Sequence, residues 1–181
     1  MKIEVEIKIK ISSPQQFRKK ASGLGKFIGI EKKIDDYYTL EELSHYPKKS
    51  LRIRKRKGQY EVNFKQKLSY INGAHAKKEY EFIIPDIKDF LDLIKEFGFK
   101  KWLHKEKISE VYEIKKNFHI EINHVKNLGW YLEIEYLATP SEIKEGRKEI
   151  DKIINKLGIT NEPIIKQGYT KLLWNKGYKR V

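Results

Sequence analysis

Nine consecutive residues near the start of the chain, residues 3–11 (IEVEIKIKI), alternate between apolar and charged side chains without a break. Successive side chains of a β-strand point to opposite faces, so this pattern predicts a strand with one apolar face and one charged face. Taken alone, such a strand is expected to turn its charged face to water. The same alternation recurs along the chain, however, and this recurrence constrains the fold more than a single strand does.

The recurring segments carry runs of similar polar side chains on one face. Residues 51–56 place three arginines there, residues 62–67 an asparagine and two lysines, and residues 132–136 two glutamates. Residues 77–82 and 119–123 add further lysine, glutamate and asparagine side chains. Like charges that face each other across an open sheet destabilise it. We therefore expect these faces to line a closed barrel, in which a metal cation and a polyanion would neutralise them.

Turn and helix signals separate the segments. The predicted strands cover residues 3–11, 26–40, 50–57, 60–68, 75–84, 99–115, 117–126 and 130–138. Apolar residues at helical spacing predict helices between Pro14 and Gly25, Pro85 and Gly98, and Thr139 and Gly158, with a short one from Tyr169 to Trp174. Together these elements predict an α+β fold: an eight-stranded antiparallel β-barrel, or tunnel, with a charged lumen and with helices packed outside.

Length and composition limit the classes of protein that remain. A chain of 181 residues predicts one domain over residues 1–181, in which residues 159–181 form a C-terminal tail with the short helix. The absence of cysteine excludes disulfides, thiolate metal sites and a cysteine nucleophile. Without a long uncharged apolar run, we expect no signal peptide and no membrane span, and therefore a cytoplasmic protein. The formal charge of +14 suits a polyanion such as nucleic acid, polyphosphate or a nucleotide.

Acidic side chains from several strands would meet inside such a barrel. Carboxylates are hard oxygen ligands, which suit Mg²⁺ or Mn²⁺ better than zinc, and an asparagine can add a neutral oxygen. The predicted metal ligands are Glu4, Glu6, Glu121, Asn123, Glu133 and Glu135. A salt bridge to a facing lysine is the alternative for any one glutamate, but it explains less well why the acids cluster on the first and the last two strands.

Basic side chains on neighbouring strands suit phosphate oxygens, arginine as a planar fork and lysine as a point charge. The candidates for phosphate binding are Lys8, Arg52, Arg54, Lys65, Lys67, Lys77, Lys105 and Lys107. A metal ion and several cations around a triphosphate are what phosphoryl or nucleotidyl transfer requires. The sequence has no glycine-rich Walker loop, no Ser-His-Asp arrangement and no histidine pair at metal-ligand spacing. His119 shares the predicted inner face and is a further candidate acid or ligand.

The order of short motifs resembles that of the CYTH, or triphosphate tunnel metalloenzyme, superfamily, which includes class IV adenylyl cyclases and thiamine and inorganic triphosphatases. Glu4-x-Glu6-x-Lys8 is similar to the signature at the N-terminus of that family. In family order it is followed by motifs at residues 35–38 (DDYY), 51–54 (LRIR), 65 (K), 77–81 (KKEYE), 123–129 (NHVKNLG) and 133–135 (EIE). Residues 168–173 (GYTKLL) resemble the closing helix of the family, so the resemblance covers almost the whole chain.

This resemblance implies roles for the matching residues. It assigns the divalent metal ions to Glu4, Glu6, Glu133 and Glu135, and the phosphates to Lys8, Arg52, Arg54, Lys65 and Lys77. Glu4, Glu6 and Lys8 then form the predicted catalytic set, with Glu79 and Glu81 as further candidates. A homodimer is implied by the resemblance alone.

Three positions depart from the family pattern. Asn123 stands where the family usually has aspartate, which removes a negative charge beside a predicted metal site. Lys77 replaces an arginine, which keeps the charge but loses the bidentate geometry. Ser109 follows Lys107 where a Lys-x-Arg is usual, so one basic ligand is absent unless Lys105 substitutes for it.

The sequence favours a metal-dependent triphosphatase, in which water attacks a terminal phosphorus of inorganic triphosphate or of a nucleoside or thiamine triphosphate. The alternative of the same architecture is a class IV adenylyl cyclase, which converts ATP to cyclic AMP and pyrophosphate. A third hypothesis is a non-catalytic module that binds nucleotide, polyphosphate or RNA. RNA binding would favour exposed aromatic residues interleaved with basic ones, which this sequence hardly shows, so we do not expect a nucleic-acid partner.

Overall fold

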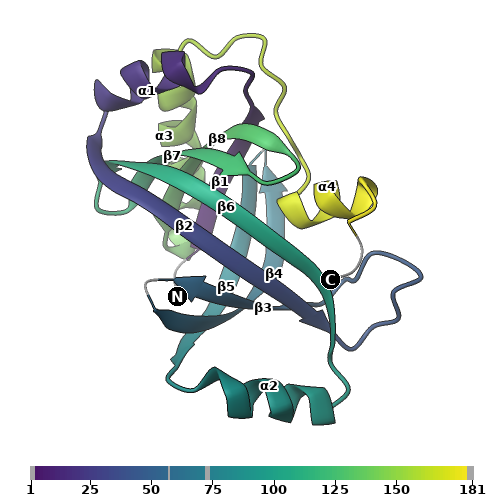
Figure 1. Cartoon of the computed structure of the whole chain (residues 1–181). Helices are drawn as coiled ribbons and strands as arrows, with labels where there is room; N and C mark the ends of the chain where they lie inside the picture. Colours follow the sequence, from purple (N-terminus) through teal and green to yellow (C-terminus); the bar gives the residue numbers. More distant parts are fainter. Residues whose placement is uncertain (1–2, 57, 72–73, 179–181) are drawn as a thin grey trace.

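The computed structural model describes residues 3–56, 58–71 and 74–178, and their side chains except those of residues 65–71 and 74–79 (Figure 1). The strands are β1 (Ile3–Lys10), β2 (Lys26–Thr39), β3 (Leu51–Arg56), β4 (Gln59–Ile71), β5 (Ala74–Ile84), β6 (Lys100–Lys115), β7 (Phe118–Val125) and β8 (Gly129–Ala138). The helices are α1 (Pro14–Ser22), α2 (Ile87–Glu96), α3 (Ile143–Lys156) and α4 (Tyr169–Asn175), with one 3₁₀ turn at Pro140–Glu142 before α3.

All strand pairs are antiparallel, and the order of pairing is β1-β5-β4-β3-β2-β6-β7-β8. Because β8 also pairs with β1, over eight residue pairs from Ile3↔Ala138 to Lys10↔Tyr131, the strands form a closed barrel. The predicted α+β class with eight antiparallel strands is confirmed, and each predicted helix is present with bounds shifted by a few residues. No helix in the described part of the chain has both the length and the apolarity needed to cross a membrane.

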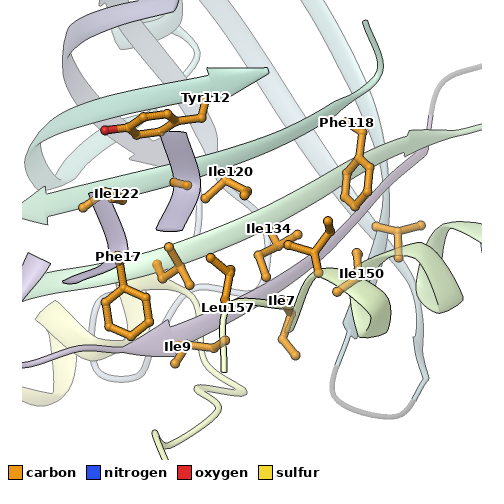
Figure 2. Close-up of a cluster of buried hydrophobic side chains, with 14 of the residues drawn as sticks. Ile7, Ile9, Phe17, Tyr112, Phe118, Ile120, Ile122, Ile134, Ile150 and Leu157 are labelled. Carbon is orange, nitrogen blue, oxygen red and sulfur yellow. The ribbon is translucent and has the colours of Figure 1, made fainter. Parts of the chain in front are cut away.

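The apolar face of β1 lies outside the barrel, under α1 and α3. Ile7 and Ile9 are fully buried there with Ile120 of β7 and Ile134 of β8, and α3 contributes Ile150 (Figure 2). Complete burial of one such side chain stabilises the fold by about 1.5–3 kcal/mol. This core fixes the register of the three strands, because a shift of one residue would exchange their apolar and charged faces.

The α3 helix follows a turn in which the side chain of Thr139 and that of Glu142 cap each other's backbone. Its apolar stripe then meets β8 closely. A Cβ atom at Gly146 would lie 2.8 Å from Cδ1 of Tyr136, so only glycine allows this approach of the helix to the strand. Ile150, Ile153 and Leu157 of this stripe are buried in the core with β1, β7 and β8.

The α4 helix lies at a different side of the barrel from α1 and α3, near the turn between β7 and β8 (Figure 1). The segment before it runs along β1, where the Lys8 carbonyl accepts a hydrogen bond from the Ile165 amide at 2.8 Å. Leu173 and Trp174 of α4 pack against Trp102 of β6 in a second core. This packing directs the first residue of α4, Tyr169, towards the charged face of the strands.

Candidate active site on the charged face of the strands

The charged faces predicted from the sequence come together in the barrel. Glu6 lies opposite Glu135, and Lys8 lies opposite Glu133, in the pairing of β1 with β8. Some ion pairs skip a strand: Lys33 of β2 reaches Glu121 of β7 at 2.8 Å although β6 lies between them. Such contacts require the concave side of the sheet, so the charged side chains point inward while the apolar ones face the helices.

Three carboxylates form the acidic part of this inner face. Glu4, Glu6 and Glu135 each offer an oxygen, and these oxygens lie within 4.8 Å of one another. Glu4 and Glu6 are buried, and Glu135 is half-buried. Buried carboxylates held this close repel one another unless a cation or protons neutralise them. A set of hard oxygen donors of this kind fits Mg²⁺ or Mn²⁺.

In a second group of charges, lysines bind the carboxylates of Glu121 and Glu133. The Lys107 ammonium donates to Glu121 at 2.8 Å and to Glu133 at 3.1 Å, and Lys8 pairs with Glu133 at 3.0 Å. Burial raises the pKa of the Glu133 carboxyl, but Lys107 and Lys8 outweigh it and hold that pKa at about 2. The Asn123 amide also donates to Glu133, at 2.6 Å. Glu133 is therefore a carboxylate at every physiological pH.

A third group surrounds Asp35, which is fully buried. The Arg54 guanidinium donates two hydrogen bonds to its carboxylate, at 2.7 and 3.0 Å, and the Lys105 ammonium lies 2.9 Å from it. Burial acts to raise the pKa of Asp35, but Lys105 and Arg54 hold that pKa well below its usual value. Burial lowers the pKa of Lys105 to about 8, although Asp35 opposes this shift.

Arg52 begins the basic side of the face on the neighbouring strands. Its guanidinium donates to Glu61 at 2.9 Å and lies 3.9 Å from Glu81, which also accepts a hydrogen bond from Asn63 at 3.3 Å. Glu81 is therefore placed among basic and neutral groups, whereas the predicted metal ligands lie on β1, β7 and β8.

The predicted metal ligands thus fall into two sets. Glu4, Glu6 and Glu135 form the close carboxylate group, whereas Glu121, Asn123 and Glu133 belong to the network around Lys107. Of the phosphate candidates, Lys8, Arg52, Arg54, Lys105 and Lys107 are on the inner face with their charges balanced by nearby carboxylates. His119 lies beside Glu113, at 3.5 Å. The side chains of Lys65, Lys67, Lys77 and Glu79 lie outside the described residues.

Sequence reasoning assigned no role to several residues of this face, among them Lys33, Asp35 and Tyr169. Glu31, Lys33 and Asp35 stand at alternate positions of β2, and all three point inward. This alternation of charged residues is visible in the sequence and was a usable signal. The motif at residues 35–38 contains Asp35, but the resemblance gave it no function. Tyr169 lies in the motif at residues 168–173, but the resemblance gave it no role, and a residue that enters the site from a helix has no strand alternation to mark it.

Comparison with known proteins identifies the family to which this fold belongs. The family model described as the CYTH domain matches residues 2–169. No curated protein matches the chain. Among solved structures, protein PH1012 of Pyrococcus horikoshii is similar at a TM-score of 0.79, with 30% identity over 93% of this chain and 98% of that one. PH1819 of the same organism has a TM-score of 0.80 and 26% identity over 96% and 99% of the two chains.

A more distant structure of the same fold carries a functional description. HpAC1 of Hippeastrum, an adenylyl cyclase candidate with a dominant triphosphatase activity, has a TM-score of 0.67 and 15% identity over 100% of this chain and 97% of its own. At this identity the likeness shows the fold alone. The matches span nearly the full length of each of these proteins.

Proposed function

The chain belongs to the CYTH domain family, and from this membership we propose that it is a divalent-metal-dependent triphosphatase. Its substrate is inorganic triphosphate or a nucleoside or thiamine triphosphate, and the reaction transfers a terminal phosphoryl group to water. The observation that carries this proposal is that buried and half-buried arginines and lysines share one inner face with a group of three carboxylates. Few reactions other than phosphoryl or nucleotidyl transfer require both groups at once.

The two groups have separate roles in this proposal. Glu4, Glu6 and Glu135 hold Mg²⁺ or Mn²⁺, which, when bound, neutralises phosphate charge and lowers the pKa of a water ligand. Glu121, Asn123 and Glu133 remain proposed ligands of a further ion, which must compete with the lysines for them. The inner face itself then serves as the lumen of a tunnel in which the phosphate chain lies.

Basic side chains bind and orient the phosphate chain. Arg54 gives its fork of two N–H donors to Asp35, and the same fork would match two phosphate oxygens that replace this carboxylate. Lys8 and Lys107 lie between the carboxylate group and the basic side, and they would bridge the metal-bound end of the triphosphate to the rest. We extend the same role to Arg52 and Lys105, to Lys65 and Lys77 by family position, and to Lys67 by its place in the sequence alternation of residues 62–67. We propose further that the protein is cytoplasmic and forms a homodimer.

A product assay tests this proposal. The protein is incubated with inorganic triphosphate or ATP and with Mg²⁺ or Mn²⁺, and orthophosphate, pyrophosphate and cyclic AMP are resolved. We expect orthophosphate from the wild type and none from Glu6→Gln. Glu106→Gln is a matched control, because Glu106 is on the outer face, paired with Lys126. Cyclic AMP with pyrophosphate would show a cyclase instead, and tight binding without turnover would show a binding module.

A further inference from the structure

Tyr169, the first residue of α4, places an aromatic ring among the basic side chains of the inner face. The Lys8 ammonium lies 4.3 Å from the ring centroid, and those of Lys105 and Lys107 lie at 5.7 and 5.8 Å. A cation over an aromatic face within about 6 Å is attracted to it. The ring therefore supports three of the lysines to which we assign phosphate binding, without giving any of them a neutralising charge.

The hydroxyl of Tyr169 is buried but has no hydrogen-bond partner of normal geometry among the described residues. A tyrosine hydroxyl carries its proton at neutral pH and can donate it in a hydrogen bond. A buried polar group without a partner costs about 1–3 kcal/mol, so its retention calls for an explanation.

Two further oxygens of the inner face are also unpaired within the described part of the chain. Oδ1 of Asn123 and Oγ of Ser109 are fully buried and have no partner there. Ser109 and Asn123 lie directly opposite each other in the pairing of β6 with β7. Tyr169 and Ser109 thus bring two neutral hydroxyl donors to a face whose lysines attract anions, whereas Oδ1 of Asn123 can only accept a hydrogen bond. An anionic oxygen is the ligand that the hydroxyls and the lysines would hold.

We propose that Tyr169 is a substrate-binding residue, whose hydroxyl donates a hydrogen bond to a nonbridging oxygen of the phosphate held by Lys8, Lys105 and Lys107. This inference rests on the proposed function, because it requires a triphosphate on the inner face. It assigns the C-terminal helix a direct role, because α4 brings a neutral donor to a site that is otherwise built from strands. The opposing interpretation is that Tyr169 only anchors α4, by packing on Tyr131 at a ring-centroid distance of 5.0 Å.

Two phenylalanine variants separate these interpretations. Tyr169→Phe removes the hydroxyl but keeps the ring over the lysines and against Tyr131. Tyr46→Phe is the matched control: the Tyr46 hydroxyl bonds the hydroxyl of Thr170, the second residue of α4, at 2.7 Å, and its ring packs on Trp102 and Trp174. Binding of inorganic triphosphate with Mg²⁺ is measured by calorimetry, together with thermal unfolding of each free protein.

We expect Tyr169→Phe to weaken triphosphate binding by about tenfold or more, the usual loss for a hydrogen bond to a charged group. Its melting temperature should equal or exceed that of the wild type, because a buried unpaired hydroxyl is removed. Tyr46→Phe should melt lower but bind within about twofold, since one neutral hydrogen bond of α4 is lost. Equal binding by the wild type and Tyr169→Phe would overturn this inference while leaving the triphosphatase proposal intact. A wild type that binds no triphosphate would overturn both.

Discussion

Replacing Asp35 with asparagine tests whether the inner charges depend on one another. The substitution keeps the shape of the side chain but removes the charge that accepts two hydrogen bonds from Arg54 and pairs with Lys105. Asp35 is fully buried, with 0% of its surface exposed, so water cannot replace the lost charge unless the site rearranges. Two buried cations would then lack their nearest anion.

The size of the effect follows from how each cation can respond. Removal of one partner from a buried ion pair costs about 3–5 kcal/mol. Lys105, whose pKa is about 8, can release its proton at little cost near neutral pH. Arg54 cannot, because a guanidinium stays protonated in proteins. We therefore expect a loss of about 3 kcal/mol, carried mainly by Arg54, from a total that is about 5–15 kcal/mol in a typical domain.

Urea denaturation at pH 7 measures this loss, with Asp36→Asn as the control. Asp36 is the next residue but faces outward, where it contacts His104 at 2.7 Å and Lys101 at 3.0 Å and is about a third exposed. Such surface pairs contribute about 0–1 kcal/mol. The folded pKa of Asp35 is depressed, so its stabilisation should be present above about pH 4 and disappear as pH falls through that lower pKa. Equal losses for the two variants would refute the reasoning.

Three further predictions concern the pH dependence, the metal and the packing of α3. The pKa of Lys105 is about 8, so its ammonium group releases its proton as pH rises from 7 to 9.5. Triphosphate binding should therefore weaken over that range in the wild type but not in Lys105→Met. In the same window the unfolded chain holds this proton and the folded one does not, so unfolding free energy should rise with pH. Millimolar Mg²⁺ should raise the melting temperature of the wild type, by linkage of binding to folding, but not that of Glu135→Gln, as calorimetry would show. Gly146→Ala should lower stability despite the better helix propensity of alanine, by about 1–3 kcal/mol from the clash with Tyr136, and urea unfolding would reveal the opposite sign if the helix can shift.

Strand periodicity predicted the fold well because one rule governs both faces of every strand. In residues 3–11 the apolar set became the core under α1 and α3, and the charged set became the inner face. Register could not be predicted, since it depends on which residues of distant strands lie opposite each other. The pairing of Lys8 with Glu133, for example, joins positions 125 residues apart.

The sequence predicted which residues belong to the candidate site better than it predicted which of them pair with each other. Every predicted acid on β1, β7 and β8 lies on the inner face, but the sequence could not show that Glu135 joins Glu4 and Glu6 while Glu133 joins the lysines. That division follows from the side-chain reach of Lys107 across β7. Tyr169 escaped prediction for a different reason: a helix contributes it, and helical periodicity describes only the packing of its neighbours Leu173 and Trp174.

The internal ion pairs set the conditions under which a substrate can bind. Arg54 and Lys105 already have Asp35, and Lys8 and Lys107 already have Glu133, so an incoming anion exchanges one set of buried contacts for another. A single phosphate would gain little from this exchange, because the carboxylates it displaces make equally short contacts. A triphosphate reaches several cations at once and loses its translational freedom only once, so its gain grows with each phosphate while that cost does not. The arrangement therefore favours a chain of phosphates over orthophosphate, which also allows the product of hydrolysis to leave.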